Sequence, residues 1–160
     1  MPTTFTDTDL QAMRLAIDAS ERAAANGDGP FGATLVPPSG DILLVASNNV
    51  KNAADCTGHA EMVLVREAQK QFDLPALRGA TVVASGELCA MCAGAMFWAG
   101  IGRIVFGASQ ADIIRVLGDS PAMPINSRTT LAGAQPAVQI DGPLLGDEAV
   151  AVLTRLGDGR

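Results

Sequence analysis

The order in which strand-like and helix-like segments follow one another most limits the fold of this 160-residue chain. Short apolar runs bounded by Gly, Pro and Asp alternate with segments whose apolar residues recur every three or four positions. The runs predict strands at residues 33–36, 42–46, 80–84, 103–106 and 137–140, and the periodic segments predict helices at residues 9–25, 59–71, 89–99, 111–117 and 147–156. This alternation predicts a three-layer α/β domain whose first two strands form an antiparallel hairpin.

The length predicts one domain over residues 1–160, because no linker or internal repeat divides the chain. The amino terminus lacks the positive start and long apolar run of a secretory signal, and no stretch of about 18 apolar residues could span a bilayer. We therefore expect a cytoplasmic protein without a membrane partner.

The charge balance argues against nucleic acid as a partner. Seventeen Asp and Glu residues outnumber eleven Lys and Arg residues, and the formal net charge is -6. No basic cluster is visible in the chain, so a polyphosphate gains little from its surface. A few well-placed arginines can still form a positive groove on an acidic protein.

Metal-binding residue types gather at the starts of two predicted helices. His59, the only histidine, is followed by Glu61, and Cys89 and Cys92 are three positions apart. Free backbone N–H groups and the helix dipole favour the thiolate forms of two such cysteines, which are the forms that bind zinc. Three protein ligands leave the fourth tetrahedral position of a zinc ion for water. Zinc lowers the pKa of water towards about 7, and Glu61 is placed to accept the proton.

Three other interpretations of these residues remain open. The cysteines of Cys89-Ala90-Met91-Cys92 could form a redox pair, which leaves His59 and Glu61 unexplained. A structural zinc site could take Cys56 as its fourth ligand. A core histidine could also stand near an unrelated cysteine pair by chance.

The motifs resemble those of the cytidine deaminase superfamily, specifically the branch of guanine, yeast-type cytosine and tRNA adenosine deaminases. The resemblance covers about residues 10–117 and is carried by Pro30-Phe31-Gly32-Ala33, Asn48-Asn49-Val50, Asp55-Cys56-Thr57-Gly58-His59-Ala60-Glu61 and Glu87-Leu88-Cys89-Ala90-Met91-Cys92-Ala93-Gly94-Ala95. The signature H-x-E followed by P-C-x-x-C is matched except for its proline, which is Leu88 here. Cys56 stands where a proline is common.

The resemblance implies a mixed five-stranded sheet between helices, with Zn²⁺ between the starts of the second and third helices. It implies hydrolytic deamination of an aminated heterocycle, with Glu61 as the acid and base, and a homodimer. It adds Asn48 as a polar anchor for the substrate and the backbone N–H of Ala60 as a donor to the substrate. Without the resemblance, Asn48 is equally well interpreted as a turn residue.

Four further residues are predicted to contact the substrate. By resemblance, Trp98 forms a wall of the pocket, and Asp112 and Asp119 accept hydrogen bonds from the amino groups of the base. Phe31 lines the site or belongs to the core. An aromatic residue in a helix is more often in the core, and an acid in the position of Asp112 is also favoured by the dipole of a helix start.

These expectations together predict a deaminase of a small heterocyclic base, with guanine ahead of cytosine and triazines. The alternative within the same family is a tRNA adenosine deaminase, which needs basic residues along the phosphate path. An alternative of another class is a zinc-binding module without activity. Glu61 argues against that module, because a purely structural site does not need this carboxylate.

Overall fold

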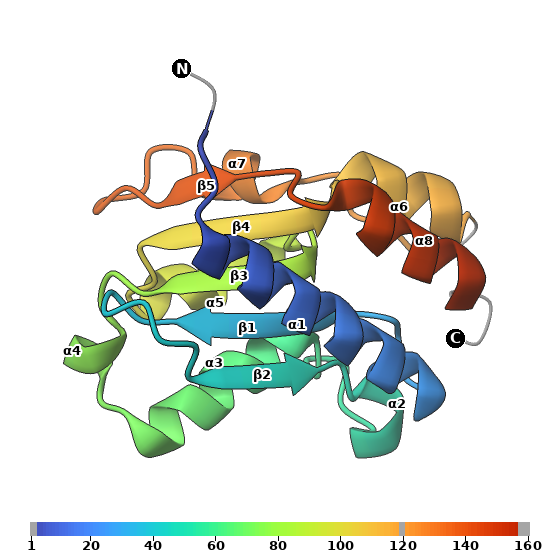
Figure 1. Ribbon diagram of the computed structural model, residues 1–160, viewed down its shortest axis with the longest axis horizontal. Helices are drawn as coiled ribbons and strands as arrows, with labels where there is room; N and C mark the ends of the chain where they lie inside the picture. Colours follow the sequence, from blue (N-terminus) through green and yellow to red (C-terminus); the bar gives the residue numbers. More distant parts are fainter. Residues whose placement is uncertain (1–2, 119–120, 157–160) are drawn as a thin grey trace.

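A five-stranded mixed sheet forms the centre of the computed structural model, which describes residues 3–118 and 121–156. The strands are β1 (Gly32–Val36), β2 (Leu44–Ser47), β3 (Thr81–Gly86), β4 (Arg103–Ala108) and β5 (Gln139–Asp141). Their order is β2-β1-β3-β4-β5 (Figure 1). β1 runs antiparallel to β2 and β3, whereas β3, β4 and β5 are parallel. The predicted mixed five-stranded sheet and its first hairpin are therefore confirmed.

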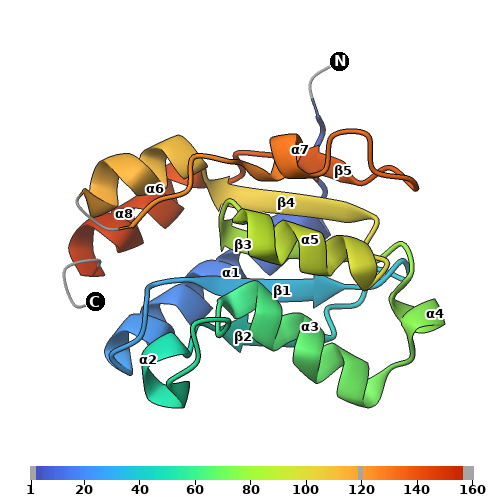
Figure 2. The ribbon, with the colours of Figure 1, turned by 180° about the vertical axis from the view of Figure 1, so that it is seen from behind.

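Helices cover both faces of this sheet. The longer helices are α1 (Asp7–Ala25), α3 (Ala60–Gln71), α5 (Ala90–Trp98), α6 (Gln110–Leu117) and α8 (Gly146–Leu156). α1 and α8 lie on the face turned to the viewer in Figure 1. Figure 2 shows α3 and α5 side by side on the opposite face. The structure thus has the predicted three layers.

Each face of the sheet has its own apolar core. Leu64 of α3 and Met96 of α5 pack with Val82 of β3 in one cluster, and Met13 of α1 and Val152 of α8 belong to the other. Adjacent residues of a strand point to opposite faces, so the continuous apolar run of β3 serves both clusters. The side chains of β1 are likewise buried along its whole length.

The shortest elements differ from the expectations. The structure adds three helices of four residues each, α2 (Val50–Ala53), α4 (Leu74–Leu77) and α7 (Ser127–Thr130), in segments predicted as loops or helix ends. The first helix begins two residues before the predicted start and is capped by Thr6, whose side chain accepts the N–H of Asp9 in a capping box. No helix in residues 3–118 and 121–156 is long and apolar enough to cross a membrane.

A buried ion cluster joins the amino-terminal helix to the edge of the sheet. The guanidinium of Arg103 lies 2.8 Å from Asp9 and 2.8 Å from Asp141, and both carboxylates are almost fully buried. Burial raises the pKa of the Asp9 carboxyl, but hydrogen bonds from Arg103 and from the backbone N–H of Thr6 outweigh it, and the pKa falls below its usual value. Arg103 therefore holds α1 and β5 against β4.

We expect Arg103→Leu to lower the free energy of unfolding by about 3 kcal/mol at neutral pH, because two buried carboxylates lose their counter-charge. Denaturant unfolding measures this difference. The stability that a depressed carboxyl pKa provides is present above the unfolded pKa of about 4 and is lost below it, so the deficit should shrink in acid. Arg155→Leu is the control, because the pair of Arg155 with Glu21 is exposed and should contribute less than about 1 kcal/mol. Equal losses in both variants would contradict this role of Arg103.

Candidate active site

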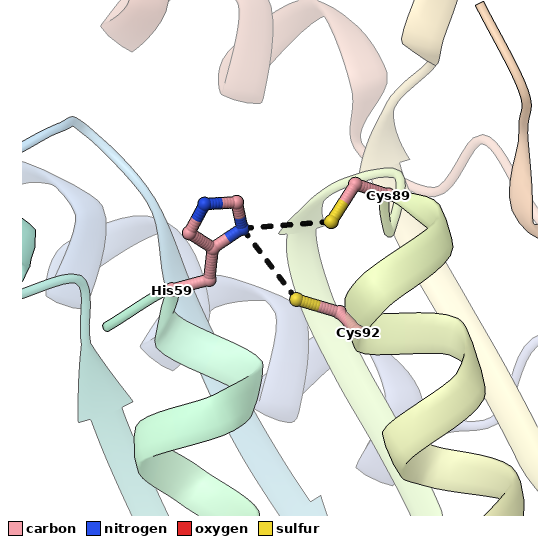
Figure 3. Close-up of side chains that lie close together, drawn as sticks. All are labelled: His59, Cys89 and Cys92. Atoms are coloured by element: carbon pink, nitrogen blue, oxygen red, sulfur yellow. Dashed lines mark hydrogen bonds between the residues drawn. The ribbon is translucent and has the colours of Figure 1, made fainter. Parts of the chain in front are cut away.

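The proposed metal ligands come from two helix starts that lie side by side. His59 is the N-cap of α3, Cys89 is the N-cap of α5, and Cys92 is in the first turn of α5. N-cap side chains usually accept a hydrogen bond from their own helix, but neither His59 nor Cys89 does so. Their side chains are therefore free to point towards each other, as Figure 3 shows.

The geometry of the three side chains fits a zinc ion. The Nδ1 atom of His59 lies 3.6 Å from the Sγ atom of Cys89 and 3.5 Å from that of Cys92. Nitrogen at about 2.0 Å and sulfur at about 2.3 Å from one ion are about 3.5 Å apart at the tetrahedral angle. Among the described residues, the group of ligand atoms within 4.8 Å of one another contains His59, Cys89 and Cys92 and does not include Cys56. The donor set is thus that of a zinc site with one open position.

The electrostatics of the three residues prepare them for a cation. A hydrogen bond from the thiol of Cys92, with help from His59, outweighs burial and lowers the pKa of the Cys89 thiol to about 4. That hydrogen bond and burial raise the pKa of Cys92, and the hydrogen bond to Cys89 raises the pKa of His59. A pKa of about 4 favours the thiolate form of Cys89 at neutral pH, while Cys92 and His59 hold their protons more strongly. A metal ion would displace the protons of Cys92 and His59, so its affinity should fall as the pH falls.

Glu61 lies beside the ligands in a dry environment. Glu61 is the second residue of α3, and only 5% of its surface is exposed. Desolvation raises the pKa of the Glu61 carboxyl and outweighs the hydrogen bond from its own backbone N–H and the charge of His59. A carboxyl group with a raised pKa can both take up and return a proton near neutral pH.

A pocket of about 720 Å³ opens at this group. His59, Glu61 and Cys89 line it, together with two of the predicted substrate residues, Phe31 and Asn48. The Oδ1 atom of Asn48 accepts the backbone N–H of Val50 at 3.1 Å, so the Nδ2 group remains available as a donor. Cys56 lies at the same pocket with an exposed thiol. The structure thus brings His59, Glu61 and Cys89 together with Phe31 and Asn48 at one cavity.

Trp98 and Asp112 are not among the residues that line the pocket. Trp98, which was predicted to form a wall of the pocket, is 80% exposed at the end of α5 opposite to Cys89. Asp112 bonds to Ser109 and Arg115, in agreement with the helix-start interpretation. Asp119 lies outside the described residues. Ala60 is fully buried as the first residue of α3, where backbone N–H groups have no partner within the helix.

Sequence reasoning missed the role of Glu87, two residues before Cys89. Its carboxylate accepts the backbone N–H of Gln110 at 2.8 Å and the hydroxyl of Ser127 at 3.2 Å. The side chain of Gln110 in turn donates to the carbonyl of Met123 at 2.7 Å. Glu87 therefore ties the starts of α6 and α7 to the motif that holds the predicted metal ligands. The sequence shows only an acid next to the cysteine motif, which does not identify its partners.

We expect Glu87→Gln to raise KM about tenfold while the zinc content stays unchanged, because an amide cannot accept both hydrogen bonds and the pocket wall shifts. Steady-state kinetics and metal analysis of the same preparations measure the two quantities. Glu148→Gln on the exposed start of α8 is the control. Loss of zinc together with activity would mean that Glu87 supports the metal ligands rather than the wall.

Several known proteins are similar to this chain in sequence or in fold. The model of the cytidine and deoxycytidylate deaminase zinc-binding region matches residues 6–108. A probable cytosine deaminase of Schizosaccharomyces pombe is 34% identical over 98% of this chain and 97% of its own length. A tRNA-specific adenosine deaminase of Haemophilus influenzae is 36% identical over 64% of this chain and 59% of its own length. The solved structure of a guanine deaminase from Nitrosomonas europaea has the same fold, with a TM-score of 0.78 and 22% identity over 99% of this chain and 88% of that one.

Proposed function

The chain belongs to the cytidine and deoxycytidylate deaminase family, and on this premise we propose that it hydrolyses the amino group of a free nucleobase or related small heterocycle. The observation that carries the proposal is the convergence of His59, Cys89 and Cys92 at a pocket that also holds the buried Glu61. A structural zinc site would need no carboxylate of this kind. The products are ammonia and the oxo form of the heterocycle.

His59, Cys89 and Cys92 would hold the zinc ion. Zinc supplies a Lewis acid that brings the pKa of water close to neutrality. Glu61 accepts a proton from the attacking water and passes it to a ring nitrogen of the substrate. A new C–O bond forms at the carbon that bears the amino group. Glu61 then takes the proton of the new hydroxyl group and transfers it to the amino nitrogen; the C–N bond breaks, the carbonyl forms and ammonia leaves.

Donors around the pocket orient the base. The Nδ2 group of Asn48 and the N–H group of Ala60 at the start of α3 both suit acceptors on the ring, such as a carbonyl oxygen. The pocket keeps Glu61 away from bulk water, which preserves its raised pKa. These residues bind and position the substrate, while Glu61 moves the protons.

A free base is a better substrate for this pocket than a base within tRNA. None of the described residues that line the pocket is Lys or Arg, and the whole chain carries a net charge of -6. A tRNA substrate requires cations along the path of its phosphates. The tRNA deaminase alternative rests on similarity over 64% of the chain, whereas the similarity to the probable cytosine deaminase extends over 98% of it.

Guanine is our first choice among the free bases, and cytosine is the second. The volume of about 720 Å³ favours a two-ring base, because it leaves a single ring loosely held. The relative matched over its full length favours cytosine. Triazines with amino groups present the same amidine-like carbon. We also propose a homodimer in the cytoplasm, which size measurement and cell fractionation would test.

Ammonia release from a panel of substrates tests the proposal. The purified zinc-loaded protein is incubated with guanine, cytosine, melamine, their nucleosides and deacylated tRNA. We expect at least one free base to release ammonia. We expect no inosine in the tRNA at the end of the reaction. Inosine formed in tRNA, without ammonia from any base, would replace the free-base proposal with the tRNA alternative.

A further inference from the structure

We propose that the substrate carries a neutral apolar substituent, which binds against the apolar part of the pocket wall. The inference rests on the proposed deaminase function and narrows its substrate class. His59, Glu61 and Cys89 line the pocket at the predicted metal site. The pocket is also lined by Ile113, Ile114 and Leu117 of α6 and by residues 121–123. We call this apolar part of the wall the apolar annex.

The annex is apolar in every described side chain that forms it. Ile113, Ile114 and Leu117 are half-buried, and Met123 is 62% exposed. Apolar side chains that remain accessible in a concave site lose this exposure to water when an apolar group covers them. The charged residues that line the pocket, Glu61 and Glu87, are both acids and lie next to the metal ligands in the sequence.

Hydrogen bonds within the protein hold one side of the annex in place. The side-chain amide of Gln110 donates to the carbonyl oxygens of Met123 at 2.7 Å and Ile125 at 3.2 Å, which holds the segment before α7 against the start of α6. Glu87 accepts the backbone N–H of Gln110. A substituent would therefore meet described residues that hydrogen bonds already hold in place.

The size of the pocket leaves room for such a substituent. Sites of roughly 300–1,000 Å³ hold drug-sized ligands, and a bare base of one or two rings fills only part of the 720 Å³ found here. A ribose phosphate would bring a negative charge to a pocket whose charged lining residues are acids. A neutral alkyl or aryl group gains about fourfold in affinity for each CH₂ group that it buries.

Matched substrates test the inference. The zinc-loaded protein is given guanine and 9-butylguanine, cytosine and 1-butylcytosine, and 1-(3-carboxypropyl)cytosine as a charged analogue of similar length. We expect kcat/KM to be at least tenfold higher for the butyl compounds and the carboxylate to show no gain. Calorimetric titration with the products uracil and 1-butyluracil, and xanthine and 9-butylxanthine, measures the same preference without turnover.

A pair of variants on one helix locates the preference. Ile114→Ala should lower the ratio of butyl to unsubstituted substrate at least fourfold. Val116→Ala is the matched control, because Val116 belongs to the same helix but packs against the core on the side of α1 and α8. Deamination of bare bases as fast as or faster than of butyl compounds would overturn the inference and leave the deaminase proposal intact. If no compound is deaminated, the proposed function is contradicted. The calorimetric titration still tests the inference in that case, because equal affinity for butylated and bare products would show that the annex binds no apolar substituent.

Discussion

Replacing Glu61 by Gln should reduce kcat at least about 1,000-fold, because the amide cannot accept the proton of water or return it to the substrate. The change conserves size, and Glu61 is not one of the three ligand residues. The zinc content should therefore remain equal to that of the parent protein. Ammonia release and metal analysis on the same preparation measure both quantities.

The control for this variant lies on the same helix. Glu67→Gln removes an acid that pairs with Lys70 on the exposed side of α3. Its turnover and stability should stay close to those of the parent protein. A Glu61→Gln protein that retains zinc and turns over at the parent rate would contradict the proton-transfer role of Glu61.

The periodicity of the sequence was sufficient for the main elements and their layers. The continuous apolar run of β3 and the three- and four-residue spacing of α1 reflect burial, which is the same property that the sheet and its two cores require. Helices of four residues, such as α4, are too short to show a period. The α4 helix lies outside the predicted elements and depends on a cap by Asp73, whose side chain accepts the N–H of Ala76.

The site was predictable where its chemistry follows from short spacings. His59 and Glu61 are two positions apart, and Cys89 and Cys92 are three apart, so each pair is fixed by one helix start. Glu87 was missed because its partners, Gln110 and Ser127, are 23 and 40 positions away and meet it only in the folded chain. Such contacts leave no pattern in a single sequence.

The exposed position of Trp98 has a geometric cause. Similarity to relatives gave a position in the sequence, but the direction of a side chain depends on the turn of the helix. Six residues after Cys92, an α-helix has turned by about 600°, which places Trp98 roughly 120° away from the ligand side. The helical period of α5 was therefore sufficient to predict that Trp98 points away from the metal ligands.

Replacing Cys92 by Ser should remove both the bound zinc and the activity, because a neutral hydroxyl group is a poor replacement for a thiolate ligand. The parent protein should bind one zinc ion per chain and lose turnover when a chelator removes it. At a free zinc concentration about 100 times Kd, binding stabilises the fold by about 2.7 kcal/mol, which raises Tm by roughly 5–10 °C. The Tm of the Cys92→Ser protein should not respond to added zinc.

Cys56→Ser is the matched control that separates an open metal site from a closed one. The exposed Cys56 lies at the same pocket but outside the group of ligand atoms, so this variant should keep one zinc ion, the zinc-dependent rise in Tm and most of the activity. If Cys56→Ser loses zinc as completely as Cys92→Ser, the metal has four protein ligands and no position for water. Because an open position is what the hydrolytic mechanism needs, that single result would make the site structural.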